Sequence, residues 1–297
     1  MWSWSEKVIL VTGGAGSIGS ALVEALLKLP VRAVRVFDHD EYGLWKLGRR
    51  IRDERLRFLL GDVRDKTRVE MALRGVDVVY HLAAIKFIDI ANYNPIEAVK
   101  TNIGGTINLV ECCLVDGPER FIYASTDKAV YPISLYGMSK AVAEKIVLWA
   151  DSVSDRTRFT AVRFGNVWES RGNVREIWEE QLIQGEPLTV TDLSMKRFFI
   201  RMDDAVRLLI KACELTEGGD IFIPEAEPVN IMEMLRNTAR KLTGGVTVDI
   251  DIIGAREEEK LEERLWTDEE EPQIKKISDG ILRIGGRHGL GEVQGVA

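Results

Sequence analysis

The sequence has few residues that could bind a metal or form disulfide bonds. Its 297 residues include three histidines and three cysteines. Cys112 and Cys113 are adjacent, whereas Cys213 lies far along the chain. Adjacent side chains point apart on a helix or a strand, so this spacing does not suit a chelate, and an odd number of cysteines indicates free thiols. We therefore expect no metal site, and we expect reduced thiols as in a cytosolic protein.

Positive charge and long apolar runs are also scarce. The 40 Lys and Arg residues are outnumbered by 47 Asp and Glu residues, which gives a formal net charge of −7. Because nucleic-acid binding depends on clustered cations, we expect no nucleic-acid partner. No apolar stretch approaches the roughly 20 residues of a membrane helix, and Met1–Glu6 is too short for a signal peptide. The sequence predicts a cytoplasmic protein without a membrane span.

Short apolar runs, in contrast, alternate with amphipathic segments through the first half of the chain. Strands that lack polar alternation and are joined by helices are typical of a parallel sheet covered on both faces. The sequence therefore predicts an α/β protein with a doubly wound parallel sheet, the Rossmann arrangement. The expected strands are Val8–Thr12, Ala33–Phe37, Leu56–Leu60, Val76–His81, Arg120–Ser125 and Thr160–Phe164, and the clearest helices are Ile18–Leu29, Pro95–Val115 and Tyr136–Ala150.

The pattern changes after Phe164, where glycines, prolines and charged residues become more frequent. We predict a dinucleotide-binding domain over residues 1–165 and a smaller C-terminal substrate-binding lobe over residues 166–297. A later helix–strand pair, Asp203–Leu215 and Asp220–Ile223, is expected to rejoin the first domain at about residues 200–223.

A glycine-rich turn links the first strand to the first helix. Glycines at this spacing allow a tight turn, let a pyrophosphate approach the backbone and permit close packing of the helix on the sheet. The N-terminus of the helix then offers free N–H groups and the positive end of its dipole to the phosphates. A bare glycine pattern also occurs in ordinary turns, but here a strand precedes it and a helix follows. The predicted nicotinamide-dinucleotide contacts are Gly13, Ala15, Gly16, Ser17, Ile18 and Gly19.

Residues at the ends of the next strands complete this predicted site. Asp38 ends the second strand about twenty residues after the glycines, where a carboxylate binds the adenosine ribose hydroxyls and repels a 2′-phosphate. This position favours NAD, although Lys46, Arg49 and Arg50 follow closely enough to accommodate NADP. Further contacts are expected from Asp62 and Val63 at the adenine and from Ala83 and Ala84 after the fourth strand.

Polar residues after the fifth strand predict a catalytic site at the carboxyl edge of the sheet, where open α/β folds bind their ligands. Thr126 is followed ten residues later by Tyr136, and Lys140 lies four residues beyond it on the same helix face. A lysine ammonium beside a cationic nicotinamide lowers the pKa of a phenol, so the phenolate can accept a hydroxyl proton as a hydride leaves. Asp127 and Lys128 add a carboxyl group and an amine. Simple alcohol oxidation needs neither, so unless they form an ordinary surface pair they suggest a second proton transfer, such as the loss of water.

With these residues in view, the chain resembles the soluble UDP-N-acetylglucosamine 4,6-dehydratases of the extended short-chain dehydrogenase/reductase superfamily. These enzymes are grouped with polysaccharide-biosynthesis and flagellin-glycosylation proteins. The resemblance runs from Val8 to about Leu265, and its most specific part is the Thr-Asp-Lys signature. The segments that carry it are Leu82–Lys86, Asn94–Asn102, Ser125–Val130, Tyr136–Lys140, Val162–Val167, Ser170–Gly172 and Lys196–Phe199.

The resemblance implies a reaction and a role for each residue. Tyr136, with Lys140, would take the C4 hydroxyl proton while the hydride passes to the cofactor, and Thr126 would hydrogen-bond the C4 oxygen. Lys128 would remove the acidified H5, Asp127 would protonate the departing C6 hydroxyl, and the hydride would return to C6. The cofactor would be regenerated in every turnover and could stay tightly bound. The product would be a UDP-4-keto-6-deoxy sugar with C5 retained or inverted.

The resemblance also implies substrate contacts and an assembly. The expected substrate contacts are Lys86, Asn166, Arg197, Arg256 and Glu259, and Lys86 is also expected at the cofactor. Arg197 would pair with the diphosphate. Glu257 and Glu258 replace the Pro and Gly of the family's Arg-Pro-Gly-Glu-Lys-Leu segment, which puts two more acidic groups beside that diphosphate. The superfamily further implies a homo-oligomer built through the helices near Pro95–Val115 and Tyr136–Ala150.

Two other interpretations stay open. A sugar-nucleotide 4-epimerase shares the glycine turn and the Tyr136–Lys140 pair, but it needs neither Asp127 nor Lys128. Its interval between the strand-five hydroxyl and the tyrosine is also usually longer. A cofactor-binding protein without turnover has no reason to keep Thr126, Tyr136 and Lys140 at this spacing.

Overall fold

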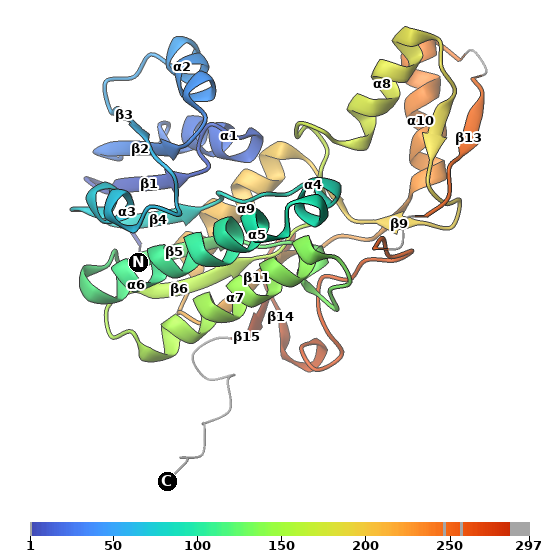
Figure 1. The fold of residues 1–297 in the computed structure, drawn as a ribbon. Coiled ribbons are helices and arrows are strands. Elements are labelled where there is room, and N and C mark those ends of the chain that lie inside the picture. Colours follow the sequence, from blue (N-terminus) through green and yellow to red (C-terminus); the bar gives the residue numbers. More distant parts are fainter. Residues whose placement is uncertain (1, 246–247, 256–257, 286–297) are drawn as a thin grey trace.

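The computed structural model describes residues 2–245, 248–255 and 258–285, and its main body is a nine-stranded sheet with helices on both faces (Figure 1). The strand order is β14-β15-β11-β6-β5-β4-β1-β2-β3. The seven strands from β11 to β3 are parallel, whereas β15 runs antiparallel to β11, and β14 antiparallel to β15. Their bounds are β1 Val8–Thr12, β2 Ala33–Asp38, β3 Leu56–Leu60, β4 Val78–His81, β5 Arg120–Ala124, β6 Arg158–Val162, β11 Asp220–Pro224, β14 Ile274–Ser278 and β15 Ile281–Gly285.

Alternating side chains along the strands build one apolar core on each face of the sheet. In β1, Ile9 and Val11 pack with α1, α2 and α9, whereas Val8 and Leu10 pack on the opposite side with α3, α6 and α7. These helices are α1 Ser17–Leu26, α2 Glu41–Arg50, α3 Lys66–Leu73, α6 Gly105–Asp116, α7 Leu135–Val153 and α9 Met202–Leu215. Among the described residues, no helix is both long and apolar enough to cross a membrane.

This architecture confirms the predicted doubly wound α/β fold and changes some of its details. The expected helix over Pro95–Val115 is α5 Pro95–Val99, a π-helical turn over Lys100–Gly104, and then α6; α4 Ile88–Tyr93 precedes it. Strand β6 begins and ends two residues earlier than predicted. The sheet is also not wholly parallel, because β14 and β15 return from the end of the described chain to cover the edge at β11.

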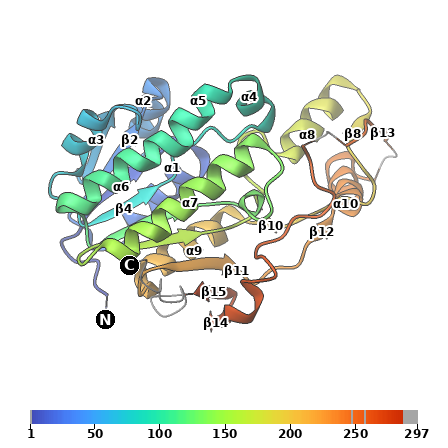
Figure 2. The same cartoon turned by 60° about the horizontal axis from the view of Figure 1, so that its bottom comes forward.

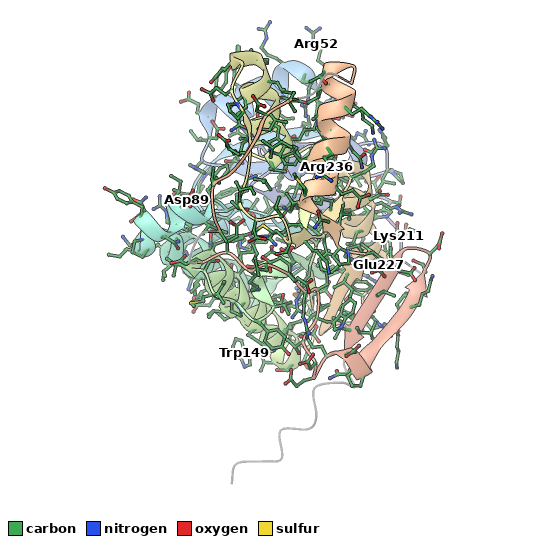
Figure 3. All side chains as sticks on the ribbon, turned by 90° about the vertical axis from the view of Figure 1, so that its right-hand side faces the viewer. Arg52, Asp89, Trp149, Lys211, Glu227 and Arg236 are labelled. Atoms are coloured by element: carbon green, nitrogen blue, oxygen red, sulfur yellow. The ribbon has the colours of Figure 1, made fainter. Side chains whose placement is uncertain are left out.

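A smaller group of elements extends from one end of the sheet (Figures 1 and 2). It consists of α8 Val174–Gln184, β8 Leu188–Val190, α10 Ile231–Thr243 and β13 Ile250–Ile252, with the short strands β7 Asn166–Val167, β9 Lys196–Arg197, β10 Phe199–Ile200 and β12 Val229–Asn230 nearby. Its own core is centred on Trp178, whose indole N–H donates to the Thr189 carbonyl at 2.9 Å. Figure 3 views the molecule from this side, where Arg236 marks α10 and Asp89 marks α4. The predicted boundary near residue 165 stays a prediction.

Candidate active site

The turn from β1 to α1 has the geometry that a dinucleotide pyrophosphate requires. Gly13 has a φ of +66°, in the left-handed region, and a Cβ at this position would lie 2.7 Å from the Ala83 backbone nitrogen. Helix α1 begins at Ser17, and its N-cap residue, Gly16, has no side chain to cap the helix. The first turn of α1 can therefore present its N–H groups to phosphate oxygens.

Asp38 closes this turn from the end of β2. Its carboxylate accepts hydrogen bonds from the Ala15 N–H at 2.9 Å and from the Asp40 N–H at 3.0 Å, and the residue is 7% exposed. Arg50, one of the cations that could accommodate a 2′-phosphate, pairs instead with Glu24 at 2.8 Å. The structure thus places an acidic group where the ribose of a dinucleotide is expected.

The other predicted cofactor contacts follow β3 and β4 at the same edge of the sheet. They are Asp62, Val63, Ala83, Ala84 and Lys86. Burial alone would raise the pKa of Asp62, but hydrogen bonds from Arg64 outweigh it and leave this pKa below its ordinary value. The Lys86 Nζ donates to the Arg171 carbonyl at 2.6 Å. Burial, and then the charge of Arg171, lowers the pKa of Lys86.

Two buried polar side chains that were not predicted hold this edge together. His81 bonds to the Thr12 hydroxyl at 2.7 Å and to the Thr106 hydroxyl at 3.0 Å. Burial lowers the pKa of His81 to about 3, so the imidazole is neutral near pH 7 and serves as a structural tie. Asn102, in the π-helical turn, accepts from the Ile85 N–H at 2.8 Å and donates to the Ile85 carbonyl at 3.0 Å. It therefore fixes the segment that carries Lys86.

The residues after β5 have different hydrogen-bond partners. The Ser125 hydroxyl donates to Glu144 at 2.6 Å, on α7. The Thr126 hydroxyl donates to Asp127 Oδ1 at 2.9 Å. Asp127 begins a 3-10 turn over Asp127–Ala129, and its other carboxylate oxygen is buried without a partner among the described residues. Thr126 and Asp127 are thus bonded to each other, and one oxygen of the buried Asp127 carboxylate has no partner in the described part of the chain.

Helix α7 positions Tyr136 and Lys140. The Ser134 hydroxyl caps the helix by accepting from the Gly137 N–H at 3.1 Å, which places Tyr136 in the first turn. Burial raises the pKa of Tyr136, although the Lys128 ammonium and a hydrogen bond with Thr126 act against the rise.

Lys140 is 3% exposed and donates to the Ala124 carbonyl at 2.6 Å. Burial lowers the pKa of Lys140 to about 7, although the Glu144 carboxylate acts against that shift. In the chain alone, the charged group that favours the Tyr136 phenolate is therefore Lys128. The effect expected of Lys140 requires the additional charge of a nicotinamide.

Side-chain oxygen atoms of three residues surround the Lys128 Nζ. Its Nζ is 3.1 Å from Asp127 Oδ1, 3.3 Å from Asn166 Oδ1 and 3.6 Å from Glu263 Oε1. Burial alone would lower the pKa of Lys128, but Asp127 and Glu263 outweigh it and leave this pKa above its ordinary value. Lys128 is therefore an ammonium ion in this structure. Glu263 was not predicted, because nothing in the acidic run that contains it distinguishes a buried carboxylate from exposed ones.

The predicted substrate residues beyond Asn166 lie nearby and are partly paired with each other. Arg197 is 3% exposed and donates to the carbonyls of Lys196 and Leu261 and to Glu259 Oε1, the last at 3.3 Å. Glu259 Oε2 is buried without a partner in the described part of the chain. Arg197 and Glu259 are thus together, and Arg256 lies outside the described residues.

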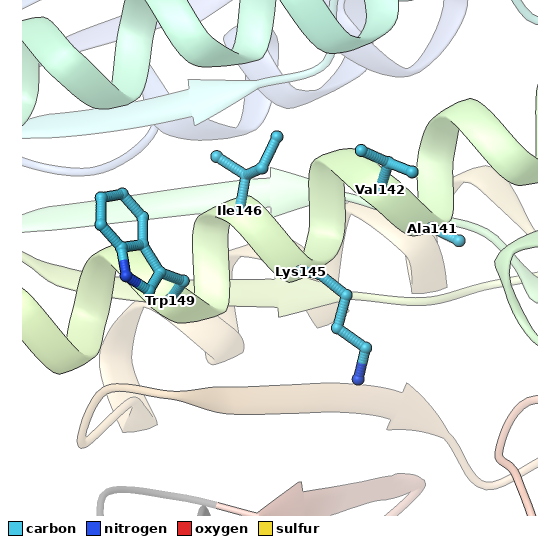
Figure 4. A pocket seen from close by; sticks show the side chains of 5 residues that line it. All are labelled: Ala141, Val142, Lys145, Ile146 and Trp149. Carbon is cyan, nitrogen blue, oxygen red and sulfur yellow. The ribbon is translucent and has the colours of Figure 1, made fainter. Parts of the chain in front are cut away.

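The opposite face of α7 carries an apolar strip. Val142 is 46% exposed and Trp149 is 54% exposed, and with Ala141, Lys145 and Ile146 they line a shallow groove (Figure 4). One helix therefore presents Tyr136 and Lys140 to the candidate active site and uncovered apolar side chains to its other side.

Comparison with known proteins gives a family match over most of the chain. The model of the polysaccharide biosynthesis protein family matches residues 9–283. A Methanocaldococcus jannaschii protein named as an uncharacterized membrane protein is 41% identical, over 93% of this chain and 85% of its own length. A Campylobacter jejuni UDP-N-acetylglucosamine 4,6-dehydratase (inverting) is 36% identical, over 88% of this chain and 77% of its own length. A Rickettsia bellii UDP-glucose 4-epimerase is 35% identical, over 92% of this chain and 82% of its own length.

Solved structures agree with this match. Pen from Bacillus thuringiensis superposes with a TM-score of 0.91 at 33% identity, over 96% of this chain and 91% of its own. A dTDP-glucose 4,6-dehydratase from Streptomyces venezuelae, solved with NAD bound, superposes with a TM-score of 0.79 at 26% identity, over 92% of this chain and 94% of its own. The family resemblance inferred from the sequence is confirmed.

Proposed function

The chain belongs to the polysaccharide biosynthesis protein family, whose relatives include nucleotide-sugar dehydratases and epimerases, and we propose that it is an NAD-dependent UDP-N-acetylglucosamine 4,6-dehydratase. The observation that carries this proposal is the Asp127–Lys128 ion pair after the carboxyl end of β5, in which the Asp127 side chain is buried and the Lys128 side chain is partly buried. An epimerase has no use for an acid and an amine at this place, whereas removal of water from C5 and C6 requires both.

The residues around the glycine turn fit NAD. Gly13 and the first turn of α1 would hold its pyrophosphate, and Asp38 would bind its adenosine ribose. NAD would accept the hydride from C4 and return it to C6. Because the reaction has no net redox change, the protein can retain the cofactor from one turnover to the next.

The first proton transfer involves Tyr136. Burial raises the pKa of its phenol, and the charge of the Lys128 ammonium acts against this rise and so favours a phenolate. Tyr136 would accept the proton of the C4 hydroxyl, and Thr126 would orient the C4 oxygen. The resulting 4-keto group makes H5 acidic.

The second transfer involves Asp127 and Lys128. Lys128 starts as an ammonium and must lose a proton before it can remove H5. Asp127 Oδ1 accepts its hydrogen bond at 3.1 Å, so a proton passed along this bond gives a neutral amine and a carboxylic acid together. Lys128 then takes H5, and Asp127 gives its proton to the departing C6 hydroxyl, which leaves as water. The ion pair is restored without an external proton. After the hydride has returned to C6, the Lys128 ammonium would give a proton to C5, and the proton held by Tyr136 would restore Lys128, so that the sugar has lost one water and each residue is back in its starting state.

The second candidate function is nucleotide-sugar 4-epimerisation. It is favoured by the 35% identical epimerase relative and by the shared Tyr136–Lys140 pair. In that case Asp127 and Lys128 would be bystanders.

One experiment separates the two functions. The protein is incubated with UDP-N-acetylglucosamine and a trace of NAD in deuterated water, and the products are analysed by NMR and mass spectrometry. Loss of water with deuterium at C5 supports dehydration, and the coupling constants report retention or inversion at C5. Formation of UDP-N-acetylgalactosamine without solvent deuterium means that the chain is an epimerase.

The same assay tests the residues. Asp127→Asn should reduce dehydration by roughly 10²-fold or more, since general acid catalysis contributes about 10²–10⁴-fold. Binding of NAD, measured by calorimetry, should be unchanged. Asp203→Asn, at the start of α9, is the matched control. Equal rates for Asp127→Asn and the wild type would remove the basis of the proposal.

The apolar strip on α7 supports a proposed homo-oligomer. Val142 and Trp149 are half exposed on the side of the helix away from the candidate active site. A second copy of the chain, packed through the same strip, would remove this apolar surface from water.

A further inference from the structure

A second charged pair lies behind Lys128. The Glu263 side chain is 4% exposed, with Oε1 3.6 Å from Lys128 Nζ and Oε2 3.0 Å from Lys260 Nζ. Lys260 also donates to the carbonyl of Val130, directly after the turn that carries Asp127 and Lys128, at 2.6 Å. Glu263 therefore bridges two lysines, and neither Glu263 nor Lys260 is needed to contact the sugar in the steps described above.

Several charged or titratable groups face Lys128. They are Asp127 from the turn after β5, Tyr136 from α7, Arg197 from β9, and Glu263, with Lys260 behind it, from the segment after residue 258. Asp127 and Glu263 hold the proton on Lys128, whereas Arg197 opposes them. Lys260 binds Glu263, so its charge offsets part of the Glu263 charge that Lys128 experiences.

This balance matters because Lys128 must exist in two protonation states. As an ammonium it pairs with Asp127 and stabilises a Tyr136 phenolate, and as an amine it can remove H5. An opposite charge within about 4–6 Å typically favours the charged form by 1–3 pKa units. Two carboxylates whose charges are not offset would hold the proton on Lys128 too strongly for Lys128 to act as a base. A single carboxylate would raise the pKa of Lys128 less than two do.

We propose that Glu263 and Lys260 act as a pair of positioning residues that set how tightly Lys128 holds its proton. Glu263 keeps Lys128 charged in the resting site. Lys260 limits this effect, so that the proton can pass to Asp127 when the sugar is bound. The inference rests on the proposed function in one respect, namely that Lys128 is the base for H5. The proton balance is unchanged, because Glu263 and Lys260 neither gain nor lose a proton.

The charge relation can be measured without turnover. Competitive acetylation of the lysines with acetic anhydride over a range of pH, followed by mass spectrometry of the peptides, reports the neutral fraction of Lys128. Glu263→Gln should lower the pH midpoint for Lys128 by about one unit, which corresponds to about tenfold faster labelling below both midpoints. Lys260→Met should raise the midpoint, because the Glu263 carboxylate then acts on Lys128 undiminished. The opposite directions of the two shifts identify the pair, since a general loss of packing would move both variants the same way.

Glu262→Gln is the matched control. Glu262 is the neighbouring residue, but its exposed carboxylate pairs with Lys196 at 2.7 Å. The Lys128 midpoint should stay at the wild-type value in this variant. Equal midpoints in all four proteins, or shifts in the same direction for Glu263→Gln and Lys260→Met, would overturn the proposal. Thermal unfolding of each variant verifies that it is folded, and Glu263→Asp, which keeps the charge, should restore the midpoint towards the wild type.

The turnover assay supplies the second readout. The basic limb of deuterium incorporation at C5, where the proton shared by Lys128 and Asp127 is lost, should move to lower pH in Glu263→Gln and to higher pH in Lys260→Met. If the wild-type chain does not dehydrate the sugar but the labelling midpoints shift as expected, the proposed function fails while the charge relation stands. If it dehydrates the sugar and the midpoints do not shift, the charge relation fails by itself.

Discussion

At the scale of single residues, two lysines twelve positions apart in the sequence show how neighbouring groups decide the charge of a side chain. Lys140 is bonded to a backbone carbonyl, and burial lowers its pKa to about 7. The Lys128 side chain is 19% exposed, and two carboxylates outweigh the effect of its partial burial and raise its pKa above the ordinary value. The same side chain is therefore poised to lose its proton at one position and holds it firmly at the other.

The low pKa of Lys140 predicts a dependence of stability on pH. Between about 7 and 10.5 the unfolded chain binds a proton at this lysine that the folded chain does not, so stability increases as the pH rises through this range. Lys140→Met should remove this contribution and raise the free energy of unfolding at pH 7. Urea unfolding at pH 7 and pH 9 measures both effects. Lys145→Met, at the outer groove of α7, is the control. The idea fails if both variants keep the wild-type difference.

Asp38 leads to a prediction about cofactor choice. Asp38→Asn removes the charge that would repel a 2′-phosphate and weakens the bond to the ribose hydroxyls. We expect NAD to bind about tenfold more weakly and NADP to bind more tightly, on the scale of 1.4 kcal/mol per tenfold change. Calorimetric titration with each dinucleotide measures the change. Asp53→Asn, whose carboxylate pairs with Arg55, should leave both affinities unchanged. An unaltered preference in Asp38→Asn would mean that another group selects the cofactor.

At the scale of helices and strands, the sequence is most predictive for those segments whose structure is specified by a local sequence pattern. The glycine turn, the polar residues after β5 and the Tyr136–Lys140 spacing all lie within short segments, and the structure has them on one sheet edge. Helix α8 carries many charged residues, and Trp178 is its one buried side chain, so its apolar periodicity is weak. In the π-helical turn, the Asn102 side chain bonds to the backbone of Ile85 in another segment, and no local pattern in the sequence shows such a contact.

The His81 tie between β4, β1 and α6 predicts acid sensitivity. In the unfolded chain this histidine titrates near 6.5, whereas in the folded chain its pKa is about 3. The unfolded state therefore gains a proton first as the pH falls, and stability is lost between about pH 6.5 and 3. This group should contribute roughly 2–3 kcal/mol of destabilisation at pH 4.5.

The variant His81→Gln keeps a neutral side chain that can hydrogen-bond but cannot take up the proton. Its unfolding free energy should fall less between pH 7 and pH 4.5, as measured by urea unfolding. His39→Gln is the control, because His39 is exposed. Parallel losses in His81→Gln and the wild type would assign the acid sensitivity to other groups.

At the scale of the whole molecule, contacts between distant segments complete the site. Arg163, after β6, pairs with Glu144 of α7 and with Glu270, more than a hundred residues later. Glu263 reaches Lys128 across a similar interval. Such pairs join residues that lie far apart in the sequence and share no local pattern. The predicted site therefore lacked the carboxylates that the C-terminal part of the chain contributes. The predicted homo-oligomer also belongs to this scale.

The proposed contact through α7 can be tested directly. Trp149→Glu would place a charge in the apolar strip, and we expect the protein to shift from oligomer to monomer in sedimentation velocity experiments. Its melting temperature at low protein concentration should stay close to that of the wild type, because Trp149 is half exposed in the single chain. Ile183→Glu, an exposed apolar residue on α8, is the matched control. An unchanged mass for Trp149→Glu would place the interface elsewhere.

The return of β14 and β15 to the edge at β11 has a consequence for how the protein is made. Strand β15 pairs with β11 along its full length, from Asp220 opposite Gly285 to Pro224 opposite Ile281. During synthesis, the first six parallel strands can assemble while the ribosome is still translating the second half. The edge at β11, however, stays open until residue 285 has left the exit tunnel. Chaperones that recognise unpaired strand edges would therefore meet this protein late in translation, at one defined place.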